Sequence, residues 1–322
     1  MVKERELLTV TLADEDGPTG YGEAAPLEQY DGVSIKRVES ALERYRQVLE
    51  DAREMTGVQM IEACRRAQDL PQALAAIDMA LWDRAGKRAG KPIAALLTDT
   101  PASAVDVNAT IGATDRRGAA QQAEAAVETG YGCIKLKVGT GDDAARVAAV
   151  RAAAGVEIAL RLDANGAWTV QEAVRAIETL APAGLELVEE PTHGLRNVRE
   201  VRERVSTRIA IDETASEHGA LGAGVADAVC LKIGGCGGIS GLLAAATLVR
   251  ASGAEAYLAS TLDGPLGIAA ALHAAAALAS RGPVPPCGLA TLGMFEDVED
   301  QLPVDNGRIV LPSAPGLGVG RL

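Results

Sequence analysis

Ionisable residues stand at the ends of five successive apolar stretches in the middle third of the chain, between residues 131 and 238. The stretches read YGCIKLKVG, IALRLDANG, LELVEEP, RIAIDET and DAVCLKIGG. Their charged residues are, in order, Lys135 and Lys137, Asp163, Glu189 and Glu190, Asp212 and Glu213, and Lys232. Steps of roughly 20 to 28 residues separate the stretches, and this is the usual length of one strand, one helix and two loops.

The carboxylates of three successive stretches would repel one another if they converged, so a hard divalent cation is their natural partner. Oxygen-only ligation favours Mg²⁺ or Mn²⁺ over zinc. A lysine that lies near a metal and another cation has its pKa lowered and can act as a base. The set therefore predicts removal of the α-proton of a metal-bound carboxylate substrate, with an enediolate stabilised by the metal and a lysine. Ordinary charges at loop junctions would explain any one stretch, but not five in succession.

The segments between the stretches are rich in alanine and have helical spacing, as in DDAARVAAVRAAAG and TVQEAVRAIETLAPAG. Repeated strand–helix units with wholly apolar strands predict a buried parallel sheet. Such a sheet, closed on itself, is a (β/α) barrel whose strands direct their carboxyl ends into one shared pocket. We therefore expect the charged residues of the five stretches to face one another.

The rest of the chain predicts a second, α+β unit. Residues 1–104 contain a candidate hairpin, a helix after Ser34, which could cap it, and a helix that stops at Gly90. The stretch VDVNATIGA, from Val105, is expected to open a barrel over residues 105–290. The tail, residues 291–322, has turn residues around a short apolar strand, so we expect it to return toward the first unit.

Composition limits the partners and the compartment. The 322 residues carry a net charge of −13, which disfavours nucleic acid and anionic membranes as partners. The five cysteines are scattered without a CxxC pair, as is typical of thiols in a reducing compartment. No signal peptide and no membrane-spanning run is recognisable, so a cytoplasmic protein is expected. The expected partner is therefore a small carboxylate substrate, and association into a homo-oligomer is a further possibility.

The motifs resemble those of the enolase superfamily, muconate-lactonizing-enzyme subgroup. The likeness lies in the KLK, DAN, EEP and DE motifs, in Lys232, and in GYGEAAPL and AAIDMALWDRAGK near the N-terminus. It implies a modified TIM barrel, (β/α)₇β, with an α+β capping domain formed by the N-terminal region and part of the tail.

The resemblance also assigns roles. It implies that Asp163, Glu189 and Asp212 bind Mg²⁺ and that Lys137 and Lys232 are the acid/base pair on opposite faces of the substrate. Lys135 would touch the substrate carboxylate and keep the pKa of Lys137 low. Asn165 and Glu213 would support these groups, with Glu213 holding Lys232 by an ion pair.

One departure from the family concerns the N-terminus. A first strand and a flexible loop normally precede the stretch equivalent to ELLTVTLA, and this chain begins almost on that stretch. We therefore expect the usual first strand and lid loop to be absent.

Within the subgroup, four reactions are candidates: o-succinylbenzoate synthase, muconate cycloisomerase, N-acylamino acid racemase and dipeptide epimerase. Dipeptide epimerases carry an Asp-x-Asp motif near the last strand that holds the peptide ammonium, and CGLATLGMF has no equivalent. GLATL, LRLDANGAWT and VNATIG resemble the synthases, so dehydration to o-succinylbenzoate is favoured. A non-catalytic binding module on the same barrel is the alternative from another class.

Three further features have two interpretations each. Asp263 and Ser260, in ASTLDG, could contact the substrate, or Asp263 could form an Asx-turn before Gly264. The glycines of KIGGCGGISG could cradle a phosphate at a helix N-terminus, or let a loop pass close to the active site. His193 could reach the mouth of the pocket, or be a solvated loop residue.

Overall fold

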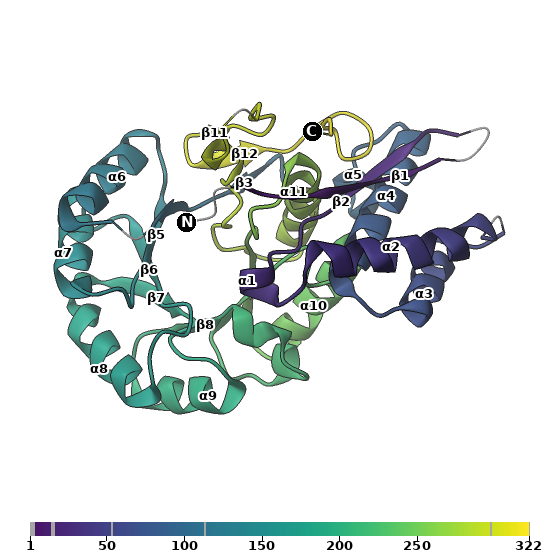
Figure 1. Cartoon of the computed structure of the whole chain (residues 1–322). Helices are drawn as coiled ribbons and strands as arrows, with labels where there is room; N and C mark the ends of the chain where they lie inside the picture. Colours follow the sequence, from purple (N-terminus) through teal and green to yellow (C-terminus); the bar gives the residue numbers. More distant parts are fainter. Residues whose placement is uncertain (1–3, 14–16, 53, 113, 297, 322) are drawn as a thin grey trace.

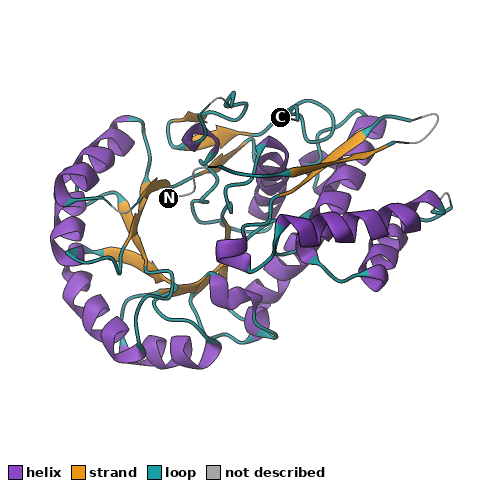
Figure 2. Ribbon diagram, viewed as in Figure 1, coloured by secondary structure: helices purple, strands orange, loops and turns teal. Residues whose placement is uncertain are grey.

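The computed structural model describes residues 4–13, 17–52, 54–112, 114–296 and 298–321. Seven parallel strands form a strongly curved sheet in the order β10-β9-β8-β7-β6-β5-β4, with helices along its outer side (Figures 1 and 2). The strands are β4 (Ala109–Ile111), β5 (Cys133–Lys137), β6 (Ala159–Asp163), β7 (Leu185–Glu189), β8 (Ile209–Ile211), β9 (Ala228–Leu231) and β10 (Glu255–Leu258). The expected parallel barrel is therefore confirmed.

A short extended segment closes the sheet. Cys287 bridges Val107 next to β4, and Gly288 bridges Ala259 just beyond β10, both in parallel orientation. Backbone hydrogen bonds on both sides, such as Asn108 N to Cys287 O at 3.0 Å and Gly288 N to Leu258 O at 2.8 Å, complete the ring. Closure brings the carboxyl ends of all the strands to one rim.

Helices connect most of the strands. They are α6 (Arg116–Glu128), α7 (Asp143–Ala154), α8 (Val170–Leu180), α9 (Leu195–Arg204), α10 (Ile239–Ala251) and α11 (Pro265–Ala279). Local signals fix their starts: Asp115 caps α6, and Thr169 with Glu172 forms a capping box at α8. Only 3₁₀ turns, at Glu213–Ser216 and Ala220–Gly222, join β8 to β9. That connection, DETASEHGALGAG, has three glycines and no helical apolar stripe.

The N-terminal region, residues 4–97, combines a hairpin with helices. The hairpin pairs β1 (Leu8–Leu12) with β2 (Gly20–Ala24), and the helices are α1 (Glu28–Asp31), α2 (Ile35–Glu50), α3 (Gly57–Ala67), α4 (Pro71–Ala89) and α5 (Ala94–Leu97). Ser34 caps α2, and Gly90 ends α4 in the left-handed conformation, as predicted. A Cβ on Gly22 would lie 1.9 Å from Ala76 O, so β2 packs directly on α4.

The stretch VDVNATIGA opens the barrel with its second half, as expected, but it does not form one continuous strand. It divides into β3 (Ala104–Asp106) and β4, and β3 belongs to a separate sheet with β12 (Arg308–Val310) and β11 (Val304–Asp305). The strand changes partner because Val107 N donates to Gly307 O in the tail while Asn108 N donates to the closing segment. Beyond β12, the tail reaches α4, where Leu317 N donates to Asp83 Oδ1 at 2.8 Å.

The N-terminal region lies against the carboxyl rim of the barrel. Arg5 Nε donates to Leu262 O at 3.1 Å, and Gly264 N donates to Glu23 Oε1 at 2.7 Å, so the hairpin touches the loop after β10. Ser240 N, at the start of α10, donates to Asp78 Oδ2 of α4 at 3.1 Å. A carboxylate of the chain thus occupies the helix start within KIGGCGGISG, which favours the other interpretation of these glycines, a loop that packs closely at the rim. No helix within the described ranges is long and apolar enough to cross a bilayer.

Candidate active site

The carboxyl ends of β5 to β8 bring a lysine and three carboxylates into one buried cluster. Lys135 Nζ lies 2.9 Å from Asp163 Oδ2 and 3.0 Å from Glu189 Oε1, and neither carboxylate is exposed to solvent. Asp212, immediately after β8, is also buried. The groups converge here because the strands are neighbours in one parallel sheet and a charged residue ends or directly follows each of them.

Two further lysines approach this cluster from opposite sides. Lys137, at the end of β5, donates to Asp163 Oδ2 at 2.6 Å and to Asn165 Oδ1 at 2.7 Å. Lys232, just after β9, donates to Asp212 Oδ2 at 2.5 Å. Because β6, β7 and β8 lie between β5 and β9 in the sheet, the two ammonium groups flank the carboxylates. A planar substrate held at the cluster would meet one lysine on each face.

Charge compensation is uneven across the cluster. Burial opposes the charge of Asp163, but Lys135 and Lys137 outweigh it and hold the pKa of Asp163 well below its ordinary range. For Glu189, burial and the charge of Asp163 together raise the pKa to about 7, even though Lys135 is 3.0 Å away. Lys135 itself has a raised pKa, since the two carboxylates outweigh its burial. Glu189 is therefore the group that would gain most from an added cation.

Asp212 and Lys232 form the second ion pair of the site. Burial opposes both charges, but their mutual attraction raises the pKa of Lys232 and lowers that of Asp212. The predicted ion pair between Glu213 and Lys232 is wrong. Glu213 Oε1 instead accepts from Asn165 Nδ2 at 3.0 Å, so Asn165 links Glu213 to Lys137.

Glu190, the second acid of the EEP motif, has a structural role in the turn after β8. Its side chain accepts from Asp212 N at 2.8 Å and from Thr214 N at 3.1 Å, and Oε1 lies 2.9 Å from His193 Nδ1. These bonds fix the backbone on both sides of Glu213. Glu190 thereby positions Asp212 without facing the cluster of carboxylates.

Two tyrosines that the sequence analysis did not identify touch the site. Tyr30 of α1 donates to Asp212 Oδ1 at 2.7 Å, and its ring centroid lies 4.2 Å from Lys232 Nζ. Tyr257 of β10 donates to Glu189 Oε2 at 2.7 Å, and its ring lies 5.1 Å from the guanidinium of the buried Arg161. The chain has five tyrosines, one phenylalanine and two tryptophans. Because aromatic residues are so scarce, each tyrosine was a possible site residue, and this was the available signal in the sequence.

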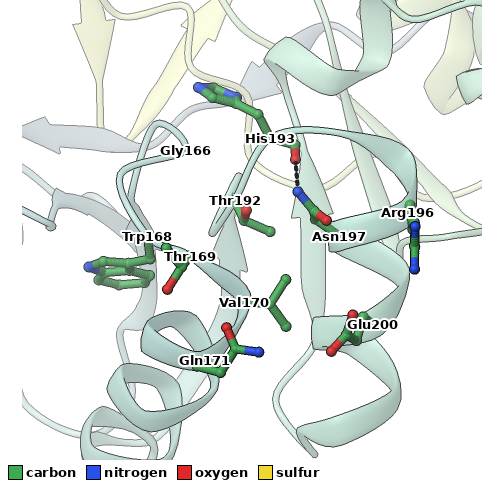
Figure 3. A pocket seen from close by; sticks show the side chains of 10 residues that line it. All are labelled: Gly166, Trp168, Thr169, Val170, Gln171, Thr192, His193, Arg196, Asn197 and Glu200. Atoms are coloured by element: carbon green, nitrogen blue, oxygen red, sulfur yellow. Dashed lines mark hydrogen bonds between the residues drawn. The ribbon is translucent and has the colours of Figure 1, made fainter.

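A cavity of about 520 Å³ opens beside the cluster, between α1 and the loops at the rim. Its lining includes Tyr30, Asn165, His193 and Glu213. A second cavity of about 510 Å³ lies on the other side of His193, between the starts of α8 and α9 (Figure 3). Neither lining includes the three lysines or the three carboxylates of the cluster. We call the first one the inner cavity, because Tyr30 and Asn165 in its lining bond directly to Asp212 and Lys137.

His193 separates the two cavities and packs on the DAN-G turn. A Cβ on Gly166, whose φ is +70°, would lie 2.1 Å from His193 Nε2. The imidazole, with 58% of its side chain exposed, is thus held between Gly166 and the buried Glu190. Both interpretations of His193 therefore hold: the residue lines the inner cavity, and it is also a loop residue in contact with solvent.

Asp263 and Ser260 bond within their own loop. Asp263 is 2% exposed, and its carboxylate accepts from Thr261 N at 3.1 Å, while Ser260 Oγ accepts from Asp263 N at 2.8 Å. Thr291 Oγ1 also donates to Ser260 Oγ at 3.1 Å. A substrate contact by either residue stays a prediction, and the local turn accounts for the bonds that the structure contains.

The buried carboxylates offer a donor set for a metal. Ligand atoms of Glu189, Asp212 and Cys230 lie within 4.8 Å of one another. Asp163 is outside that tight group, and its Oδ2 contacts the ammonium groups of Lys135 and Lys137. Carboxylate oxygens on three neighbouring strands, with incomplete compensation at Glu189, fit a hard divalent cation.

Comparisons with known proteins agree with this geometry. A family model described as mandelate racemase / muconate lactonizing enzyme, N-terminal domain, matches residues 1–98, and one described as enolase C-terminal domain-like matches residues 118–320. A hydrophobic dipeptide epimerase of Enterococcus faecalis is 33% identical over 286 residues, which cover 86% of this chain and 80% of the relative. An o-succinylbenzoate synthase of Mycobacterium bovis is 37% identical over 224 residues, 66% of this chain and 65% of the relative.

A solved structure extends the agreement to three dimensions. The crystal structure of the dipeptide epimerase from Enterococcus faecalis, complexed with Mg and the dipeptide L-Leu-L-Tyr, superposes with a TM-score of 0.88 at 30% identity. The match covers 98% of this chain and 92% of that one. The chain is an enzyme of the mandelate racemase / muconate lactonizing enzyme family, which belongs to the enolase superfamily.

Proposed function

We propose that this enzyme removes the α-proton of a carboxylate substrate with the help of Mg²⁺, and that its reaction is the dehydration that forms o-succinylbenzoate. The observation that carries the proton-transfer chemistry is the pair Lys137 and Lys232, which flank three buried carboxylates at consecutive strand ends. Such a pair supplies a base on one face of a substrate and a cation or acid on the other.

Asp163, Glu189 and Asp212 would hold the metal. When bound, Mg²⁺ supplies positive charge to the substrate carboxylate, which acidifies the neighbouring carbon. Mn²⁺ has the same preference for oxygen ligands and is an acceptable substitute. The dipeptide epimerase of similar fold, solved with Mg, supports this assignment.

Each of the three lysines has a separate proposed role. Lys137, as the neutral amine, would take the α-proton and become an ammonium group, and Asn165 would keep this amino group directed at the site through the 2.7 Å bond. Lys232 would stabilise the negative charge that develops on the opposite face, while Tyr30 orients it. Lys135 would contact the substrate carboxylate, since its ammonium group already lies between Asp163 and Glu189, two of the proposed metal ligands.

The choice of substrate rests on the segment after α11. Residues 285–295, PPCGLATLGMF, contain no acidic side chain that would pair with the free ammonium of a dipeptide. This segment closes the barrel at the rim, so its composition bears directly on the substrate site. Greater local identity to the o-succinylbenzoate synthase, 37%, supports the same choice. Dipeptide epimerisation is the second candidate, because the epimerase matches a larger share of the chain.

A turnover screen distinguishes these functions. The protein is incubated with succinyl-hydroxycyclohexadiene carboxylate, muconate, N-succinyl amino acids and dipeptides in D₂O, with Mg²⁺ or with EDTA. Metal-dependent formation of o-succinylbenzoate is the expected result. Epimerised dipeptide with no dehydration would favour the second candidate, and no exchange with any substrate would favour a binding module.

Two lysine variants test the mechanism. Lys137→Ala is expected to reduce α-proton exchange by at least about 100-fold, while Lys232→Arg, which keeps the charge, leaves exchange measurable in a dehydratase. In a racemase or epimerase, both lysines transfer protons, so each variant would lose exchange from one stereoisomer and keep it from the other. Lys36→Ala, at an exposed position of α2, is the control. Exchange that neither active-site substitution alters would contradict the mechanism.

A further inference from the structure

We propose that the centre has a second binding mode, in which Cys230 joins Glu189 and Asp212 to bind a thiophilic divalent cation such as Zn²⁺ or Cd²⁺. The inference rests on the same carboxylates as the proposed Mg²⁺ site, but not on any particular substrate. It predicts that such cations compete with Mg²⁺ and inhibit the enzyme.

Cys230 lies in β9, two residues before Lys232, which directly follows the strand. Side chains two residues apart in a strand point to the same face, so Cys230 and Lys232 both enter the barrel. The ligand atoms of Glu189, Asp212 and Cys230 lie within 4.8 Å of one another, and all three residues are buried. They come from adjacent strands β7, β8 and β9, so a rigid sheet holds them together.

The thiol has no other evident task in the structure. Cys230 is 2% exposed, and within the described residues its sulfur makes no hydrogen bond. By contrast, Cys133 Sγ lies 3.8 Å from Glu186 Oε2, and Cys287 Sγ lies 3.5 Å from Pro285 O. A buried sulfur without a partner, directed at two carboxylates, is a potential third ligand.

The donor types determine which cation is preferred. Mg²⁺ takes hard oxygen ligands, whereas thiolate sulfur favours Zn²⁺ and other soft or borderline ions. Binding forms one sulfur–metal bond and releases the thiol proton to solvent, without any change of oxidation state. The thiolate and two carboxylates carry three negative charges, one more than the charge of the cation, and Lys135 and Lys232 lie beside the carboxylates.

Cadmium titration of the metal-free full chain tests the proposal. The wild type is expected to develop a sulfur-to-cadmium charge-transfer band that saturates at about one equivalent and is suppressed by excess Mg²⁺. Cys230→Ser keeps the size of the side chain and should lose the band, with Cd²⁺ affinity lowered by at least about tenfold. Cys236→Ser, just beyond β9, is the matched control and should keep the band.

Several outcomes would overturn the proposal. These are a full band in Cys230→Ser, a band unaffected by saturating Mg²⁺, and a ¹¹³Cd resonance of the wild type in the oxygen-only range. The resonance needs no variant, so it decides even where Cys230→Ser does not fold. Cadmium–sulfur binding without turnover of any substrate would instead contradict the proposed function alone.

Discussion

Tyr257→Phe removes a single hydroxyl from beneath the carboxylate cluster. In the wild type this hydroxyl donates to Glu189 Oε2 at 2.7 Å, and Tyr257 is 1% exposed, so no solvent can replace it. The ring itself is kept, and with it the packing on Arg161. The substitution therefore tests one hydrogen bond rather than the volume of the side chain.

The expected loss follows from the charge of the acceptor. A buried hydrogen bond to a charged group contributes about 1.5–3 kcal/mol, and about 1.4 kcal/mol corresponds to a tenfold change in binding. If Tyr257 orients Glu189 for the metal, Mg²⁺ affinity should fall about 10- to 100-fold, as for other groups that orient metal ligands. Calorimetric titration of the metal-free protein with MgCl₂ measures this directly.

Tyr45→Phe is the matched control. Tyr45 is also buried, and its hydroxyl donates to Gln68 O at 2.6 Å in the N-terminal region. This variant should lower the free energy of unfolding in urea by about 1 kcal/mol and leave Mg²⁺ affinity unchanged. An unchanged Mg²⁺ affinity in Tyr257→Phe, with lower stability, would show that Tyr257 only supports the fold and would refute the reasoning.

Two further predictions concern stability. Burial lowers the pKa of His273 from 6.5 to about 4. As pH falls, the unfolded chain therefore takes up a proton before the folded chain does. The free energy of unfolding is unaffected by this group above about pH 6.5 and is lower by about 3 kcal/mol at pH 4. Urea unfolding across this range should show the loss in the wild type and much less of it in His273→Gln. Gly166→Ala introduces a Cβ that would lie 2.1 Å from His193 Nε2 in a backbone at φ +70°, and should cost about 1–2 kcal/mol or more. Adding His193→Ala should restore the part of the free energy of unfolding that was lost through the clash with the imidazole. If nothing is restored, the whole loss comes from the backbone conformation of residue 166.

The strand ends were predictable because each signal is local. An apolar stretch that ends in a charged residue and repeats at the spacing of a strand–helix unit identifies both the strand and its terminal group. This is why Lys135, Lys137, Asp163, Glu189 and Lys232 were placed together from the sequence. Asp212, at the end of the fourth stretch, was placed with them for the same reason.

Contacts between distant elements could not be predicted in this way. Tyr30 meets Asp212 across 182 positions of sequence, and Tyr257 meets Glu189 across 68. Nothing in the spacing of α1 shows where the N-terminal region packs on the barrel. The division of VDVNATIGA into β3 and β4 has the same cause, because the partner of β3 lies in the tail. Glu213 bonds to Asn165 because of the shape of the turn after β8, which the hydrogen bonds of Glu190 hold in place, and the sequence does not show this shape.

The contact between Asp83 and Leu317 has a consequence for how the chain assembles. Oδ1 of the buried Asp83 accepts from a backbone group 234 residues away, and His273 Nε2 lies 3.1 Å from the carbonyl oxygen of Leu317. During synthesis, α4 therefore leaves the ribosome long before Leu317. Oδ2 of Asp83 has nearer partners, Tyr21 N and Lys87 Nζ, but Oδ1 accepts from the tail. Contacts between segments so far apart in sequence slow folding and extend the time during which early segments are exposed. The bond between Asp83 and Leu317 can form only after the tail has been synthesised.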